Sequence, residues 1–394
     1  MKVILICSTL LAAGQASRPA ASERVVVDFL VTAPTTQPGE RVFLAGNDVA
    51  LGGWRADGLA LRRREDGRYE GSIRVRRGAE LEYKVTRGSW ETVEKDAGGG
   101  EIANRRLTPG QDMTVEIEVR AWGGAGAAAR KSTRSGDLRT HGGFRSKFLE
   151  NDRTVIVYLP PGYEKDAAAH YPVLYMHDGQ NLFDAATSFL GVEWAADETA
   201  ERLIAAGRIA PIIIVGIYNT GARMNEYTPW PDEHRRGGGG GDAYARFLVE
   251  EVKPFVDATY RTQPDARHTG VAGSSLGGLI SLYMCEKYPD TFSMCGVMSP
   301  ALFWADKRII REAGEACGAL RHCRIWLDMG TREGDSVGEF SQGIAATREL
   351  VAAFDRCGMA PGRDYYYFED DGAVHNEGAW AKRFDKMLLF FFAK

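Results

Sequence analysis

The sequence of 394 residues lacks any long apolar run and any long basic run. A helix needs roughly 18 to 20 consecutive apolar residues to cross a bilayer, and no segment reaches that length. Nucleic-acid binding needs a concentrated lysine and arginine surface, whereas the net charge here is -4. We therefore expect no membrane span and no nucleic-acid partner. The 44% hydrophobic and 26% charged content is typical of a soluble globular protein, and the length favours two domains.

Cysteine is also scarce, with six residues in the chain. The spacing of the five that follow Cys7 matches no zinc site, so no metal centre is expected. An odd number leaves at least one thiol unpaired. Cys317 and Cys323 could close a small loop, while burial as apolar side chains explains these residues equally well. The other three cysteines are Cys285, Cys295 and Cys357.

The amino-terminal residues have the pattern of a secretory signal peptide. Lys2 precedes an apolar run over residues 3–13, and small residues follow around Ala16. The run is too short to span a bilayer. We predict a signal peptide over residues 1–22, with cleavage near Ala16 or a few residues later, and a mature protein that is secreted or periplasmic.

The pattern of apolar runs divides the rest of the chain into two domains. Over residues 24–120, short alternating runs are separated by Pro, Gly and Asp turns, which is typical of a small all-β sandwich. Residues 121–136 are rich in Gly and Ala and are expected to form a linker. Over residues 137–394, apolar strands alternate with helical segments. This alternation predicts an α/β fold with a mostly parallel sheet and helices on both faces.

The most informative motif is Gly273-Ser274-Ser275-Leu276-Gly277, where an apolar strand gives way to an apolar helical run. This is the pattern of a nucleophile elbow, a strained turn that exposes a serine hydroxyl and needs small flanking residues. Ser275 is therefore the candidate nucleophile. Small residues also occur at ordinary strand-to-helix turns, so the interpretation depends on the residues that follow.

A serine nucleophile needs a histidine base and an acid that orients it. In this fold the expected order along the chain is serine, acid, histidine. His375 follows the elbow and two further strands, and is the candidate base. The acid is expected just after the strand at 325–329, where Glu333 is preferred and Asp335 is the alternative. Two aspartates close to the histidine in sequence also compete for this role, Asp370 and Asp371.

The developing oxyanion needs two backbone donors. One is expected to be the N–H of Leu276, directly after the nucleophile. The second is expected from the loop after the strand at 173–176, where Gln180 is the preferred donor and Gly179 allows a tight turn. His177 has no second ligand at a recognised spacing, so we expect neither a metal nor an organic cofactor.

At these residues the second domain resembles the esterase family of α/β-hydrolases, which includes feruloyl and acetyl-xylan esterases, enterochelin esterases, S-formylglutathione hydrolases and mycolyltransferases. The resemblance implies an α/β-hydrolase fold and a triad of Ser275, Glu333 and His375, with an oxyanion hole at Leu276 and Gln180. It covers roughly residues 137–394 and rests on five blocks in the expected order: Val157-Tyr158-Leu159-Pro160-Pro161-Gly162-Tyr163, Tyr175-Met176-His177-Asp178-Gly179-Gln180-Asn181-Leu182-Phe183, Gly273-Ser274-Ser275-Leu276-Gly277-Gly278, Gly330-Thr331-Arg332-Glu333 and His375-Asn376-Glu377.

The first domain resembles starch-binding modules of carbohydrate-binding family 20. The matching residues include Val42-Phe43-Leu44-Ala45-Gly46, Leu51-Gly52-Gly53-Trp54, Leu81-Glu82-Tyr83-Lys84-Val85 and Trp90-Glu91. The resemblance implies a stacking platform for sugar rings, because aromatic faces suit the apolar CH faces of sugars. An acidic, glycine-rich insertion before Asn104 departs from the family pattern, and both tryptophans are also plausible core residues. The residues implied in glycan binding are Trp54, Trp90, Lys84 and Asn104.

Together these features predict an exported serine carboxylic-ester hydrolase that removes feruloyl or acetyl groups from a saccharide. The same machinery suits a siderophore trilactone, which is the first alternative. A glycan-binding protein without catalytic activity is the alternative from another class. The expected partner is a polysaccharide or acylated saccharide.

Overall fold

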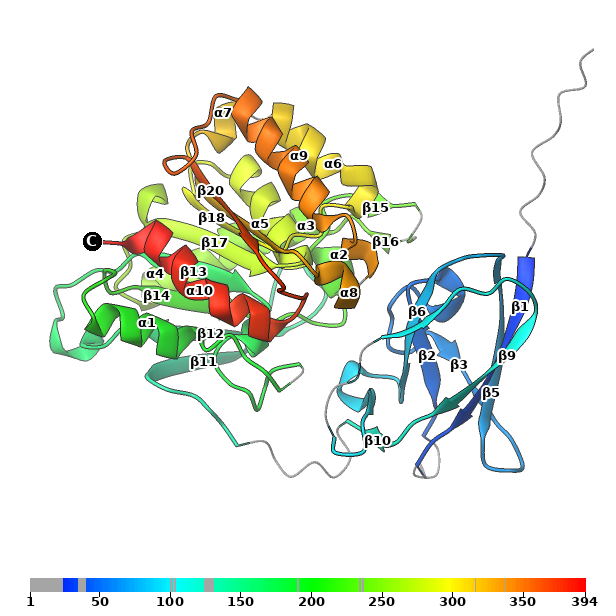
Figure 1. Cartoon of the computed structure of the whole chain (residues 1–394). Coiled ribbons are helices and arrows are strands. Elements are labelled where there is room, and N and C mark those ends of the chain that lie inside the picture. Colours follow the sequence, from blue (N-terminus) through cyan, green and yellow to red (C-terminus); the bar gives the residue numbers. More distant parts are fainter. Residues whose placement is uncertain are drawn as a thin grey trace, which may run out of the picture.

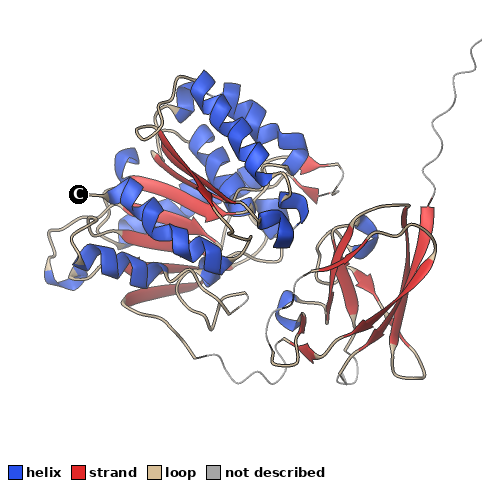
Figure 2. Ribbon diagram, viewed as in Figure 1, coloured by secondary structure: helices blue, strands red, loops and turns tan. Residues whose placement is uncertain are grey.

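The computed structural model describes residues 24–34, 40–99, 102, 104–123, 131–189, 191–233, 235, 237–315, 317–336 and 338–394. These residues form a β-rich domain and a larger α/β domain (Figures 1 and 2). The predicted signal peptide lies outside the described residues, as do residues 124–130 of the predicted linker.

The first domain consists of short strands around one apolar core. Its strands are β1 (Arg24–Thr32), β2 (Phe43–Gly46), β3 (Leu59–Ala60), β4 (Arg62–Arg63), β5 (Tyr69–Arg76), β6 (Leu81–Thr86), β7 (Glu94–Lys95), β8 (Arg105–Leu107), β9 (Met113–Glu118) and β10 (Ala121–Trp122), with short helical turns η1 (Val49–Leu51) and η2 (Trp90–Thr92).

Two four-stranded sheets make up most of this domain, in the orders β4-β5-β1-β9 and β3-β2-β6-β8. Alternate residues of β1 are buried, as expected for a strand with one face on a core. They pack with residues of the second sheet in one apolar cluster that includes Val27, Phe29, Leu44, Tyr83 and Val85. The predicted β-rich amino-terminal domain is therefore confirmed.

The second domain is built on an eight-stranded sheet of order β11-β12-β14-β13-β17-β18-β19-β20. The pairings of β11 with β12 and of β12 with β14 are antiparallel, and every pairing from β14 to β20 is parallel. The sheet is therefore mixed, with the parallel part that the sequence predicted. Its strands are β11 (Asp137–Phe144), β12 (Arg153–Leu159), β13 (Val173–His177), β14 (Ile213–Ile217), β17 (Thr269–Ser274), β18 (Met294–Met298), β19 (Arg324–Gly330) and β20 (Tyr365–Asp370), and a separate hairpin pairs β15 (Pro231–Asp232) with β16 (Gly237–Gly238).

Helices cover both faces of the large sheet (Figure 1). The helices are α1 (Ala196–Ala205), α2 (Arg223–Glu226), α3 (Gly241–Arg246), α4 (Lys253–Thr259), α5 (Leu276–Lys287), α6 (Trp304–Glu315), α7 (Cys317–Leu320), α8 (Glu333–Ser336), α9 (Gly343–Arg356) and α10 (Glu377–Phe392), with short turns η3 (Tyr163–Lys165), η4 (Gly179–Asn181), η6 (Ala266–His268) and η7 (Gly338–Phe340), and a wider turn η5 (Phe247–Val252) between α3 and α4.

Alternate side chains of the strands enter two separate cores. Val155 and Val157 of β12 pack in the cluster that contains residues of α5, α6 and α9, whereas Ile156 and Tyr158 pack in the cluster that contains residues of α1 and α10. This alternation is the period of a β-strand that is buried on both faces. None of the described helices is long and apolar enough to cross a membrane.

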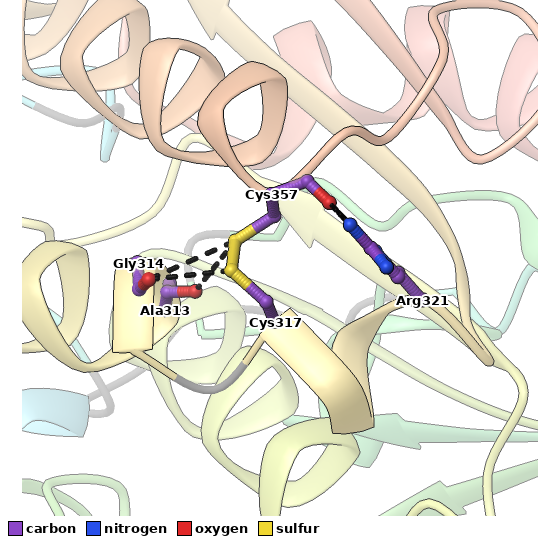
Figure 3. Close-up of a disulfide and its surroundings, with 5 residues drawn as sticks. All are labelled: Ala313, Gly314, Cys317, Arg321 and Cys357. Atoms are coloured by element: carbon purple, nitrogen blue, oxygen red, sulfur yellow. Dashed lines mark hydrogen bonds between the residues drawn. A yellow bond between two sulfur atoms is a disulfide. The ribbon is translucent and has the colours of Figure 1, made fainter.

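Two details differ from the expectations. Ala121 and Trp122, at the start of the expected linker, form β10 and pair with β7, so they belong to the β domain. Cys317 forms a disulfide with Cys357, not with Cys323 (Figure 3). Local spacing suggested the shorter loop, but Cys323 directly precedes β19, and its thiol is free and buried in the core.

Candidate functional site

The turn between β17 and α5 holds Ser275 in a conformation that few side chains adopt. Its φ is 60° and its ψ is −124°, and α5 begins at the next residue. A Cβ on Gly273 would lie 2.9 Å from the backbone carbon of Gly277, so the strand and the helix approach too closely for a side chain there. The turn therefore has the strained geometry expected of a nucleophile elbow, with Ser275 partly exposed.

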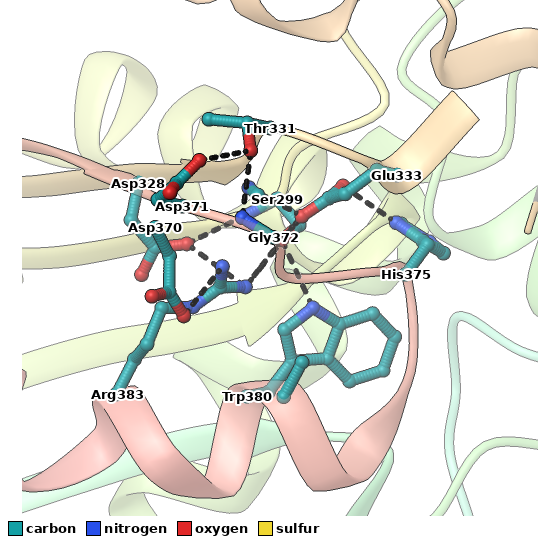
Figure 4. Close-up of polar contacts among 12 residues, drawn as sticks. Ser299, Asp328, Thr331, Glu333, Asp370, Asp371, Gly372, His375, Trp380 and Arg383 are labelled. Carbon is teal, nitrogen blue, oxygen red and sulfur yellow. Dashed lines mark hydrogen bonds and ion pairs between the residues drawn. The ribbon is translucent and has the colours of Figure 1, made fainter. Parts of the chain in front are cut away.

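Glu333, the first residue of α8 after β19, and His375, in the loop after β20, come together. Glu333 Oε2 accepts a hydrogen bond from His375 Nδ1 over 2.9 Å (Figure 4). The carboxylate of Glu333 is almost fully buried, and its Oε1 accepts from the backbone N–H of Gly330 over 2.7 Å. An acid in this position fixes the histidine tautomer in which Nε2 is the proton acceptor.

The other acids that the sequence offered have different surroundings. Asp370 Oδ2 lies 3.6 Å from Arg383 Nη1, and Asp371 Oδ1 accepts from the hydroxyl of Thr331 over 3.2 Å. The side chain of Asp335 is outside the described part of the chain. Of the candidates whose side chains are described, Glu333 has a hydrogen bond with His375.

Ser299 lies at the centre of a buried polar cluster behind this pair (Figure 4). Its hydroxyl donates to Glu333 Oε1 over 2.5 Å and accepts from Trp380 Nε1 and Arg383 Nη2 over 2.9 and 2.7 Å. The same Arg383 nitrogen lies 3.3 Å from Asp328 Oδ1. The cluster satisfies the second oxygen of Glu333 and so restricts the rotation of its carboxylate.

Electrostatics favour a charged Glu333. Burial alone would raise its pKa, but the hydrogen bond and charge of His375, with the bonds from Ser299 and Gly330, outweigh burial, and the pKa lies below its ordinary value of 4.5. Burial has the opposite result at Asp328, where it raises the pKa to about 6 despite the charge of Arg383. Glu333 is therefore the better anionic partner for a protonated histidine.

The polar cluster is also tied to the serine turn. The backbone N–H of Ser275 donates to the carbonyl oxygens of Met298 and Ser299 over 3.1 and 3.2 Å, and Ala301 N–H donates to the Ser275 carbonyl over 3.0 Å. Thus the segment that carries Ser299 fixes the backbone of Ser275 on one side and contacts Glu333 on the other. The three candidate catalytic residues share one edge of the sheet.

The expected oxyanion donors lie in two turns that pack together. Leu276 is the first residue of α5, where backbone N–H groups have no partner within the helix. A Cβ on Gly277 would lie 3.3 Å from His177 Cβ, which places the start of α5 against the loop that contains Gln180. The side-chain oxygen of Gln180 accepts from Asn219 N–H over 3.1 Å, and this bond holds η4 in place.

His177, the last residue of β13, is a buried structural residue directly before this loop. Its Nδ1 lies 2.8 Å from the Tyr244 hydroxyl, and burial lowers its pKa to about 3. Next to it, Asp178 pairs with Arg223 over 2.7 Å. These contacts hold the loop in a rigid form.

Among the described residues, one acidic group has the spacing of a cation site: Glu193, Asp197 and Glu198, whose ligand atoms lie within 4.8 Å of one another. Burial and a hydrogen bond from Glu198 raise the pKa of Asp197 to about 8. A protonated Asp197 would reduce the repulsion among these carboxyl groups.

In the β domain, the structure brings Trp54 and Trp90 together, with ring centroids 6.2 Å apart and both rings half-buried. Lys84 Nζ donates to the carbonyl of Ile102, and Asn104 donates to Glu82 Oε2 over 3.2 Å. The aromatic pair is therefore accessible, whereas the two expected polar groups already have partners within the domain.

Sequence reasoning did not single out Ser299, Arg383, Trp380 or Phe340. The ring of Phe340 lies against His375, with centroids 3.8 Å apart. Ser299 follows β18 by one residue, and polar residues that follow parallel strands gather at the same sheet edge. That rule could have identified Ser299, but the other three come from helices and a turn without such a signal.

The mixed sheet, with helices on both faces and a strained serine turn after a central strand, defines an α/β-hydrolase-like fold. Residues 146–391 match the family described as "Putative esterase", and the chain belongs to this family of carboxylic-ester hydrolases. Residues 24–115 match the family described as "Starch binding domain". Both resemblances seen in the sequence are confirmed.

Individual relatives agree with the family assignment. The chain is 25% identical to the uncharacterized protein YbbA of Bacillus subtilis (strain 168) over 259 residues, 64% of this chain and 97% of YbbA. It is 26% identical to the ferri-bacillibactin esterase BesA of the same organism over 207 residues, 44% of this chain and 67% of BesA. The solved structure of a ferulic acid esterase shares the fold, with a TM-score of 0.51 and 21% identity over 65% of this chain and 97% of that chain.

Proposed function

We propose that the protein is an exported serine carboxylic-ester hydrolase that removes feruloyl or acetyl groups from a saccharide through an acyl-enzyme. The observation that carries this proposal is the hydrogen bond of 2.9 Å between Glu333 and His375, at the sheet edge where Ser275 occupies its strained turn. No group in the proposed reaction requires a metal or an organic cofactor.

In the proposed mechanism, Ser275 Oγ attacks the ester carbonyl while His375 Nε2 takes its proton. The N–H groups of Leu276 and Gln180 stabilise the oxyanion. His375 then protonates the leaving alcohol, activates a water molecule that attacks the acyl-enzyme, and returns the proton to Ser275. Glu333 remains charged throughout and stabilises the imidazolium, as its lowered pKa favours.

A cavity of about 190 Å³ supports an apolar acyl group, and its lining includes Pro300, Leu302, Phe303, Phe340 and Ala346. Pro300 precedes the residue that binds the Ser275 carbonyl, and Phe340 contacts His375. We propose this cavity as the acyl pocket, because its aromatic and aliphatic residues suit an acyl chain or a feruloyl ring, while Lys307, Ser341 and Gln342 add polar groups to the lining. Comparing acetyl, feruloyl and longer acyl esters would test it, since a pocket of limited size discriminates among them.

We propose that Trp54 and Trp90 hold the saccharide part of the substrate, with any polar contribution of Lys84 and Asn104 secondary. The match of residues 24–115 to the starch binding domain family and the accessible aromatic pair support this role. Export is part of the same proposal. The Cys317–Cys357 disulfide supports it, because disulfides persist mainly in oxidising compartments.

The decisive test is hydrolysis of p-nitrophenyl acetate and methyl ferulate by the wild type and Ser275→Ala. We expect turnover by the wild type and loss of at least about 10³-fold in kcat in the variant. Ser293→Ala is the matched control, because this half-buried serine directly precedes β18, at the end of the strand that is opposite to the catalytic edge. An inactive wild type that still binds glycan would favour a non-catalytic binding protein.

A siderophore trilactone is the second candidate substrate, because BesA is a ferri-bacillibactin esterase. The same triad and oxyanion donors would act on it. Parallel assays with a catecholate trilactone and an acylated xylan oligosaccharide separate the two. A kcat/KM that is higher for the trilactone by tenfold or more would select the siderophore substrate.

A further inference from the structure

The β domain contacts the α/β domain beside the candidate active site. β6, the strand that carries Glu82, lies on the side of the β domain that faces α8 (Figure 1), and it pairs with β8, which carries Arg106. Glu82 Oε1 accepts a hydrogen bond from the backbone N–H of Gly338 over 2.9 Å. Arg106 Nη2 donates to the backbone carbonyl of Gly334 over 3.0 Å. Two side chains of one domain therefore bind the backbone of one loop of the other.

The segment that they bind consists of the short helix α8 and the turn η7, and we call these two elements the acid loop. Glu333 at its start has the hydrogen bond with His375 Nδ1, and Phe340 at its end has its ring 3.8 Å from the His375 ring. Gly334 and Gly338 lie between these two contacts. The β domain thus fixes the acid loop at two backbone positions, one directly after Glu333 and one two residues before Phe340.

Glu82 and Arg106 are themselves held in place. Arg106 Nε lies 3.1 Å from Glu82 Oε1, and Asn104 donates to Glu82 Oε2 over 3.2 Å. Glu82 is 7% exposed, which reduces solvent screening of its hydrogen bond to Gly338. On another part of the boundary the rings of Trp90 and Phe189 meet at 6.2 Å, so the contact between the domains does not depend on the acid loop alone.

We propose that Glu82 and Arg106 are positioning residues for catalysis, which hold the acid loop so that Glu333 is aligned with His375. The β domain then completes the active site in addition to binding saccharide. This inference rests on the proposed function, because it assumes that Glu333 and His375 act in ester hydrolysis. A carboxylate that is free to shift by about 1 Å would orient the imidazole less well, and such shifts can cost up to about 10²-fold in rate.

The test is the steady-state kinetics of full-length Arg106→Ala and Glu82→Ala with p-nitrophenyl acetate, a substrate with no sugar for the β domain to bind. We expect kcat to fall about tenfold while KM changes by less than about twofold. The acid limb of the kcat/KM profile should move to lower pH, because a misaligned carboxylate stabilises the imidazolium less. Arg106→Lys, which keeps a donor for Gly334 and a charge for Glu82, should restore most of kcat.

Arg74→Ala is the matched control, because this exposed arginine lies on β5 in the other sheet of the β domain. Melting temperature and starch affinity report whether each variant keeps its fold. Should Glu82→Ala unfold, Arg106→Ala decides, since Arg106 is an exposed strand residue.

Values of kcat and pH profiles that match the wild type in folded Arg106→Ala would overturn the inference. The proposed function fails separately, if Ser275→Ala keeps its activity. An inactive Ser275→Ala together with a fully active Arg106→Ala therefore refutes only the positioning role.

Discussion

The candidate catalytic residues and the tryptophan pair of the β domain differ in how firmly their side chains are held. At the catalytic edge Glu333 is 1% exposed, and both of its oxygens have hydrogen bonds. Trp54 and Trp90 are half-buried, and their rings contact each other. Bond cleavage needs groups fixed within a fraction of an ångström, whereas a sugar ring can slide on an aromatic face. Mutations at the catalytic edge should lower kcat for every ester. Mutations of the two tryptophans should affect only the binding of polysaccharide.

The largest expected effect comes from the histidine. His375→Ala should lower kcat by about 10³- to 10⁵-fold on both p-nitrophenyl acetate and an acylated polysaccharide. In the proposed reaction His375 both takes the proton of Ser275 and protonates the leaving alcohol, so one substitution removes both proton transfers. His170→Ala, at an exposed position, is the control and should match the wild type. A loss confined to the polymer would place His375 outside the chemistry.

Glu333→Gln should lower kcat by about 10²- to 10⁴-fold, since an amide neither fixes the tautomer nor stabilises the imidazolium. It also has a signature in stability. The folded-state pKa is below 4.5, so the carboxylate stabilises the native state above that pH, and this stabilisation is lost as pH falls through the lowered pKa. Urea unfolding of Glu333→Gln should therefore depend less on pH below about 4.5 than that of the wild type.

Glu349→Gln is the control for this series, because Glu349 is exposed and pairs with Lys307 at the surface. It should change neither kcat nor the pH dependence of unfolding. Equal acid sensitivity of wild type and Glu333→Gln would contradict a lowered pKa at Glu333.

Arg383→Met tests how much the buried cluster contributes. Arg383 is fully buried, and its loss leaves Asp328 without a nearby cation and Ser299 without one donor. We expect the free energy of unfolding to fall by about 3 kcal/mol, measured by urea titration. Arg202→Met, whose exposed side chain lies 3.8 Å from Asp385, should cost no more than about 0.5 kcal/mol. If the two variants lose similar amounts of unfolding free energy, the buried cluster around Arg383 contributes no more to stability than a surface ion pair.

The smallest effect on kcat is expected at the tryptophan pair of the β domain. Trp54→Ala and Trp90→Ala should each weaken retardation in starch or xylan gels by about tenfold and leave kcat on p-nitrophenyl acetate within about twofold. Val49→Ala, an exposed apolar residue of η1 in the same domain, is the control. Unchanged retardation, or no retardation of the wild type in any glycan, would leave this domain with the positioning role alone.

Local patterns predicted most of the elements that position the site. The strands expected over residues 173–176 and 325–329 lie within β13 and β19, and the helical run expected after the elbow is α5. The elbow could be recognised because the strand, the turn and the helix are consecutive in sequence. The disulfide partner of Cys317 could not, since 40 residues and a complete α/β unit separate it from Cys357.

By itself the sequence determined the two domains, the esterase family and the candidate residues Ser275, Glu333 and His375, because apolar periodicity and turn residues act over a few neighbours. Tertiary structure alone decided that Ser299 and Arg383 contact Glu333, that Trp380 binds Ser299, and that Glu82 and Arg106 of the first domain bind the acid loop. These contacts join elements far apart in the chain. Their geometry depends on how whole layers pack, which no local pattern encodes.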